Sequence, residues 1–171
     1  MRLCDKDLYD EVKRYEIEKS LSDTERREDM NKDDVLKALN QNNFEIFRCS
    51  QGMSHLVLED DFEILVQLCN GSISEKRMEL LKHILQNYET YLTKAMQQLK
   101  AFQIEIGENY FSYGIYVGEF SFGTHGFQMF DGFTISLKRA EGTIEDYLNL
   151  DVYTIQFKSN GHPLGVDLWF E

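Results

Sequence analysis

The spacing of apolar residues along the chain changes several times, and each change predicts a different element. Residues 1–43 are rich in charge and carry two short apolar stripes with spacings of three and four residues, which predicts short helices. The stripes are formed by Leu8, Val12 and Tyr15 and by Val35, Leu36 and Leu39. Asn31 or Asp33 can cap the second helix, and the polar stretch 20–32 is typical of a solvated connection.

Residues 44–70 alternate between apolar and polar positions, which predicts short strands. Phe44 and Ile46 begin this alternation, and two apolar runs follow at 55–58 and 62–68. The acidic sequence Glu59-Asp60-Asp61 separates the two runs. We therefore expect a hairpin with an acidic turn, ended by Asn70-Gly71.

Residues 72–103 show the helical period over their whole length, so we expect one long amphipathic helix of about 40 Å. Ser72 and Glu75 match the capping box that opens helices. The apolar positions are Met78, Leu81, Leu85, Tyr88, Leu92, Ala95 or Met96, Leu99 and Phe102. A coiled coil is the competing interpretation, but Asn87 and the aromatic residues on the apolar face favour packing against a sheet.

The last part of the chain, residues 104–171, is dominated by aromatic, strand-like runs separated or interrupted by glycines. The runs cover residues 102–106, 111–122, 127–138, 152–158 and 164–170. Ser159-Asn160-Gly161 predicts a hairpin between the last two, and Pro163 stands at the start of the final strand. Thr143 and Asp146 mark a short helical turn that runs through Leu150.

These patterns together predict a single α+β domain over residues 1–171: a curved, antiparallel meander packed against one long amphipathic helix, with short helices at the N-terminus. At 171 residues the chain can bury one sizeable core, and 42% of its residues are hydrophobic.

The charge balance narrows the possible partners. Thirty Asp and Glu against 18 Lys and Arg give a formal charge of −12, which opposes binding to nucleic acid and to anionic membranes. A basic protein is the partner that this charge favours. Solubility alone is the alternative explanation of the acidic excess.

Cysteine and histidine usage argues against metal sites and disulfides. Cys4, Cys49 and Cys69 form no C-x-x-C pair, and the four histidines have no metal-ligand spacing. The carboxylates at 59–61 and 63 lack the spacing of a calcium loop, so a solvated turn is the preferred interpretation. With no secretory signal and no membrane-length apolar run, we expect a cytoplasmic protein without cofactors.

One histidine in a predicted loop is a candidate for catalysis or ligand binding. His125 lies between glycines in Gly123-Thr124-His125-Gly126, where an imidazole can act as a base or bind a ligand. No nucleophile motif or phosphate-binding glycine loop accompanies it. A small-ligand or enzymatic pocket between helix and sheet, lined by His125, Tyr113 and Tyr116, therefore stays as an alternative function.

Carboxylates and aromatic residues of the final part predict an interaction surface, because the rings supply buried area while the charges steer association. The candidate residues are Glu141, Glu145, Asp146, Tyr147, Asp151, Asp167 and Trp169. Trp169 shares a strand face with Asp167 if Leu164, Val166, Leu168 and Phe170 occupy the other, although Trp169 can equally belong to the core.

The layout of short strands, Ser-capped helix and closing hairpin ending in Leu168-Trp169-Phe170-Glu171 resembles small bacterial domains, some of which are thought to be immunity proteins of polymorphic toxin systems. The resemblance covers about the last hundred residues. It implies a non-catalytic protein that neutralises a toxin by binding it, and carries over no active site. An acidic interaction module is thus the leading hypothesis, and a structural subunit of a larger assembly is a third; the oligomeric state is left open.

Overall fold

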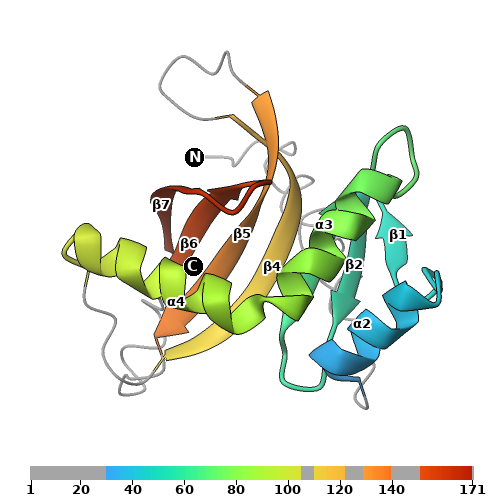
Figure 1. Cartoon of the computed structure of the whole chain (residues 1–171), viewed down its shortest axis with the longest axis horizontal. Coiled ribbons are helices and arrows are strands. Elements are labelled where there is room, and N and C mark those ends of the chain that lie inside the picture. Colours follow the sequence, from blue (N-terminus) through green and yellow to red (C-terminus); the bar gives the residue numbers. More distant parts are fainter. Residues whose placement is uncertain (1–29, 105–109, 122–128, 140–150, 171) are drawn as a thin grey trace, which may run out of the picture.

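A computed structural model of the chain describes residues 30–104, 110–121, 129–139 and 151–170. The helix expected around Leu8 to Tyr15 and the helical turn expected at 143–150 lie outside these ranges. In chain order the elements are α2 (Lys32–Asn40), β1 (Arg48–Ser50), β2 (Met53–Val57), β3 (Glu63–Gln67), α3 (Glu75–Gln86), α4 (Tyr88–Ala101), β4 (Tyr110–Ser121), β5 (Met129–Arg139), β6 (Asp151–Lys158) and β7 (Pro163–Phe170) (Figure 1). The expected α+β class is confirmed.

The described strands form one seven-stranded sheet in which spatial order equals sequence order. All neighbouring strands pair antiparallel except β3 and β4, which run parallel with Glu63 opposite Gly114. A parallel pair needs a long crossover, and α3 and α4 supply it between these two strands. The sheet is therefore mostly antiparallel, and the expectation of an entirely antiparallel arrangement is wrong at this one pairing.

A single row of aliphatic side chains crosses six strands and forms the centre of the core. The registers place Leu56, Ile64, Ile115, Ile135, Ile155 and Val166 side by side. The first five are at most 4% exposed, while Val166 on the last strand is partly buried. Because neighbouring strands bring β-branched side chains together on one face, this row ties the two halves of the sheet into one core.

The expected single long helix is wrong, because the chain forms two helices that meet at Asn87. Asn87 leaves the helical conformation, and its side-chain amide donates a hydrogen bond to the His83 carbonyl at 2.9 Å. Asparagine competes in this way for backbone groups, which ends α3 and lets α4 start in a new direction (Figure 1).

The break changes which residues face the sheet. Tyr91 is 5% exposed in the core, whereas Phe102, expected on the apolar face, is 55% exposed beyond the last turn of α4. Helix α3 packs against α2 and β4, and α4 crosses β5, β6 and β7. Two shorter helices can follow the twist of the sheet, which one straight helix cannot.

Both helices α2 and α3 are capped by a polar side chain of the predicted kind. The cap of α2 is at a predicted residue, and the cap of α3 lies two residues after the predicted one. Asn31 caps α2 with a reciprocal bond to Asp34, as expected for one of its two candidates. For α3 the cap is Ser74, which accepts from the Arg77 amide, while the Ser72 hydroxyl donates to the Cys69 carbonyl. The expected cap at Ser72 is therefore wrong.

Several strand predictions are confirmed and two are wrong. The hairpin β2–β3 with its acidic turn is present, and so is the hairpin β6–β7 across Ser159-Asn160-Gly161, with Pro163 as the first residue of β7. Residues 44–47 precede the first strand instead of belonging to it. A strand-like run was also expected at 102–106. Its described part, residues 102–104, instead follows the end of α4, where the Ile104 amide donates to the Leu99 carbonyl.

Candidate functional site

The strand registers bring several acidic segments to one end of the sheet. Tyr110 pairs with Arg139, and Asp151 pairs with Phe170, so these four strand ends lie at the same end. Because β3 runs parallel to β4, its first residue, Glu63, points to that end as well. The acidic turn between β2 and β3 therefore also lies there.

Five exposed carboxylates gather at this end from two elements. They are Asp33 and Asp34 at the start of α2 and Glu59, Asp60 and Asp61 in the β2–β3 turn. The two elements are held together because the Glu59 amide donates to the Met30 carbonyl at 3.2 Å and Lys32 Nζ lies 3.6 Å from Asp60. We refer to these five residues, with Glu89, as the acidic end.

Lys32, the cation paired with Asp60, lies against two aromatic rings. Lys32 Nζ lies 4.0 Å from the centre of the Phe62 ring and 5.2 Å from that of Tyr88. The pKa of Tyr88 is raised to about 12, chiefly by burial and in part by the negative charges of Glu89 and Asp60, while Ser112 acts in the opposite direction. Glu89, in the first turn of α4, thereby belongs to the same negative environment.

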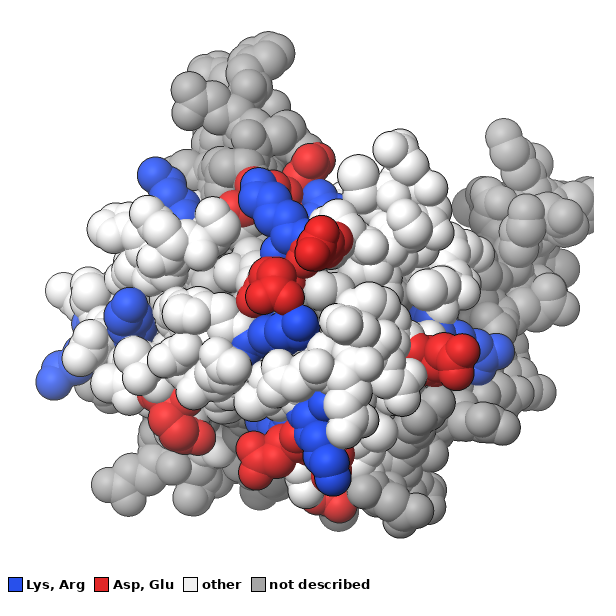
Figure 2. All heavy atoms as spheres, turned by 45° about the vertical axis from the view of Figure 1, so that its right-hand side comes forward, with Lys and Arg blue, Asp and Glu red and all other residues white. Residues whose placement is uncertain are grey.

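Charge is unevenly divided along the chain. The described ranges hold 14 of the 30 Asp and Glu and 11 of the 18 Lys and Arg, a formal charge of −3 out of −12. Figure 2 shows a face on which blue and red side chains lie next to one another on a mostly uncharged surface. An electrostatic field strong enough to select a partner therefore requires several carboxylates close together, as at the acidic end.

The interface residues expected from sequence fall partly within the described ranges. Glu141, Glu145, Asp146 and Tyr147 lie outside them. The backbones of Asp151 and Trp169 lie in paired strands next to the acidic end, opposite Phe170 and Val152. Asp167 is exposed on β7 and accepts a hydrogen bond from the Gln156 amide.

A second polar cluster occupies the opposite end of the parallel pair, around Arg77. This side chain is 8% exposed, donates to the Gln67 carbonyl at 2.8 Å and to Asp131 at 3.3 Å, and lies 3.6 Å from Glu119. The Gln67 side chain in turn accepts from the Glu119 amide. The end of β3, the start of α3 and the neighbouring strands β4 and β5 are thereby joined.

The electrostatics of this Arg77 cluster are balanced. The pKa of Asp131 lies below its ordinary value, chiefly because the Lys76 ammonium donates a hydrogen bond to it, with a further contribution from Arg77 and an opposing one from burial. Two cations, Lys76 and Arg77, face two carboxylates, Asp131 and Glu119. The groups that Arg77 contacts all belong to the protein itself. The arrangement is that of a structural clamp rather than of a reactive site.

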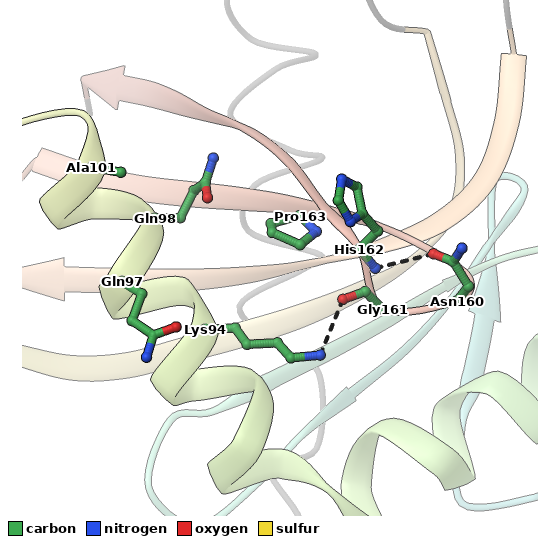
Figure 3. Close-up of a pocket in the computed structure, with 8 residues that line it drawn as sticks. All are labelled: Lys94, Gln97, Gln98, Ala101, Asn160, Gly161, His162 and Pro163. Atoms are coloured by element: carbon green, nitrogen blue, oxygen red, sulfur yellow. Dashed lines mark hydrogen bonds between the residues drawn. The ribbon is translucent and has the colours of Figure 1, made fainter.

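A groove of about 660 Å³ runs between α4 and the turn that joins β6 to β7 (Figure 3). Its lining residues are Lys94, Gln97, Gln98, Ala101, Asn160, Gly161, His162 and Pro163. The four helical residues follow the spacing i, i+3, i+4, i+7, so they share one flank of α4. Lys94 reaches across to the turn, where its Nζ lies 3.4 Å from the Gly161 carbonyl oxygen.

The turn side of the groove is fixed against the aromatic core. Gly161 has φ +78°, and a Cβ atom there would lie 2.7 Å from the Tyr91 ring. Tyr91 packs edge-on against Phe133 and Phe157, whose rings are stacked 4.8 Å apart. The groove thus has a rigid wall, as ligand sites commonly do.

The pocket expected around His125 is only partly within the described residues. His125 lies outside them. Tyr116 alternates with the core residues Ile115 and Val117, so it lies on the sheet face away from α3 and α4. Tyr113 lies at the β4 bulge, with Lys138 Nζ 5.0 Å from its ring centre.

Metal ligation finds no support in the part of the chain that the structure describes. No group of three or more His, Cys, Asp or Glu side chains there could hold a metal ion. Cys49 and Cys69 are exposed free thiols. Within the same residues, no helix is long and apolar enough to cross a membrane.

Sequence reasoning missed the groove and the Arg77 cluster. Nothing in the sequence places the helix flank formed by Lys94, Gln97, Gln98 and Ala101 beside the turn at Asn160. The burial of Arg77 has no signal in the sequence, because it depends on the β3–β4 pairing.

Comparison with protein-family models, with curated proteins and with solved structures finds no match to this chain.

Proposed function

We propose that this protein is a non-catalytic interaction module that binds a basic partner through the acidic end, in the manner of a toxin-neutralising immunity protein of a bacterial cytoplasm. The observation that carries the proposal is the gathering of carboxylates from α2, the β2–β3 turn and α4, with Lys32 lying against Phe62 and Tyr88. Such a surface accelerates association with a cationic protein and disfavours other partners.

The predicted interface on the last strands extends this surface. Asp151 and Trp169 stand in strands β6 and β7, whose Asp151 and Phe170 ends lie at the same end of the sheet as the β2–β3 turn, and Asp167 is exposed three residues before the end of β7. Glu141, Glu145, Asp146 and Tyr147 lie outside the described residues, and their acidic and aromatic character is what supports their part in the interface. We include these residues in the proposed interface.

The alternative function, a ligand pocket lined by His125, Tyr113 and Tyr116, has less support. Tyr116 lies on the sheet face opposite to α3 and α4, so it does not contribute to a pocket between helix and sheet. The interaction hypothesis is therefore preferred.

Affinity capture from the native lysate tests the proposal, with the double variant Glu59→Gln, Asp61→Asn against the matched variant Glu75→Gln, Glu79→Gln. Both remove two exposed carboxylates, and asparagine accepts the φ of +58° found at residue 61. We expect a Lys- and Arg-rich partner that the wild type and the control capture equally, with at least about tenfold weaker binding to the first variant and weaker binding in high salt.

Two outcomes would count against the proposal. One is capture of no basic protein, and the other is a partner whose affinity is the same for the Glu59/Asp61 variant and the wild type. The same variants can be titrated with oligolysine, a defined probe that separates a missing partner from a surface that does not attract cations.

A further inference from the structure

We infer that the groove between α4 and the β6–β7 turn is a binding site for a carboxylate-bearing ligand. This site is separate from the acidic end and has the opposite charge, so it is independent of the proposed function. The chemistry is shared by a small organic acid and by an acidic side chain of a peptide, and the experiment below separates these two sources.

The first argument is the charge of the lining. Among the residues that the structure describes, no Asp or Glu lines the groove, and the ionisable lining residues are Lys94 and His162. In a protein of formal charge −12, a hollow whose described lining holds only cationic and neutral groups favours an anion over the cations that the rest of the surface attracts.

The second argument is the hydrogen-bonding capacity that the groove leaves unused. Lys94 has three N–H donors, and one of them is directed at the Gly161 carbonyl at 3.4 Å. The side-chain oxygen of Asn160 accepts from the His162 amide at 3.1 Å, and this bond leaves the two side-chain N–H donors of Asn160 unused. Gln97 and Gln98 add further donors from the helix side (Figure 3).

The third argument is geometry. Lys94 reaches from α4 to the turn, where its ammonium contacts the Gly161 carbonyl oxygen, while Gln97 and Gln98 stay on the helix side (Figure 3). A carboxylate there can take a charge-assisted bond from Lys94 and a second bond from an amide. The turn is held in place by Gly161 on Tyr91, so little order has to be created on binding.

Titration of the full-length, ¹⁵N-labelled chain, followed by ¹H–¹⁵N correlation spectra, tests the site. The probes are glutarate, an acetylated and amidated tetraglutamate peptide, and inorganic phosphate. We expect saturable shifts of the Gly161 and His162 amides and of the Gln97, Gln98 and Asn160 side-chain amides. Binding of both carboxylates with similar affinity identifies a free organic acid as sufficient, and much tighter binding of the peptide identifies an acidic segment.

Variants separate the site from general anion attraction. Lys94→Gln is expected to weaken carboxylate binding about tenfold, and Gln98→Ala, which leaves Lys94 in place, to weaken it severalfold. The matched control is Lys100→Gln, because Lys100 is exposed on the opposite flank of α4. Its affinity should equal that of the wild type.

The inference is overturned if neither carboxylate shifts these amides, if phosphate binds as tightly as the carboxylates, or if Lys94→Gln and Gln98→Ala both retain wild-type affinity. The reference spectrum of each variant shows whether it is folded, so a loss of binding caused by unfolding is recognised directly.

Discussion

At the scale of single residues, Arg77 is a buried cation whose guanidinium contacts three polar or charged groups. It joins the Gln67 carbonyl, Asp131 and Glu119, which belong to three different strands. A buried ion pair of this kind adds little net energy over a well-packed apolar pair. Removal of Arg77 is costly nevertheless, because the Gln67 carbonyl and Asp131, which is 25% exposed, both lose a hydrogen-bond donor.

We expect Arg77→Met to lower the free energy of unfolding by about 2–4 kcal/mol, since the Gln67 carbonyl and Asp131 lose their buried donor. The matched variant is Lys76→Met, whose side chain also contacts Asp131 but is 73% exposed. It should change stability by less than about 1 kcal/mol. Urea unfolding measures both values, and equal effects would show that Arg77 is no clamp.

Asp131 makes the stability of the same cluster depend on pH. Its pKa is lowered from 3.8 in the folded protein, mainly by Lys76 and further by Arg77. The stabilisation is therefore present above pH 4 and is lost as the pH falls through the folded pKa. We expect the difference in unfolding free energy between wild type and Asp131→Asn to be constant from pH 5 to pH 7 and to shrink below pH 4, as measured by urea unfolding at each pH. A difference that does not depend on pH would contradict the assigned pairing.

At the scale of elements, the sequence correctly predicted those features that depend only on residues close together in the chain. Asn31 as a cap, the β2–β3 hairpin and the β6–β7 turn are fixed by residues within a few positions of each other. The break at Asn87 was not predicted, because the apolar period continues through it and the sequence does not show that its side-chain amide bonds the His83 carbonyl. The parallel β3–β4 pairing was also missed, since 42 residues separate the two strands.

The β6–β7 turn gives a sharp test of local geometry. Gly161→Ala places a methyl group 2.7 Å from the Tyr91 ring at a φ of +78°, so both backbone strain and a clash are added. Gly52→Ala has nearly the same φ, +84°, but no atom within 4 Å of the new methyl group. We expect about 1 kcal/mol of destabilisation at Gly52 and about 2–4 kcal/mol at Gly161.

Thermal unfolding of the two glycine variants supplies the comparison, and the difference between them isolates the contact with Tyr91. If both variants lose the same stability, the turn is able to move away from the aromatic core. The wall of the groove would then be less rigid than its contacts indicate, and the carboxylate site would have to be formed on binding.

At the scale of the whole molecule, the sequence predicted the class of fold and the sign of the charge but not how the charge is placed. Net charge follows from composition, whereas the acidic end exists because strand register brings α2, the β2–β3 turn and the ends of β4 to β7 to one side. The groove is likewise a product of assembly, since its two walls are separated by about sixty residues of chain.

The row of aliphatic residues from Leu56 to Val166 predicts that the molecule unfolds as one unit. Ile115 lies in the middle of this row, is 2% exposed and contacts strands from both halves of the sheet. We expect Ile115→Ala to cost about 2–5 kcal/mol, and Val166→Ala, at the partly buried end of the row, clearly less.

Helical circular dichroism follows α2 to α4, and the fluorescence of the single tryptophan, Trp169, follows β7. Because one core joins them, both signals should change at the same urea concentration in the wild type and shift together in Ile115→Ala. Separate midpoints would show instead that the part from α2 to β3 folds independently, and the parallel β3–β4 pair would then be a seam between two units rather than the centre of one.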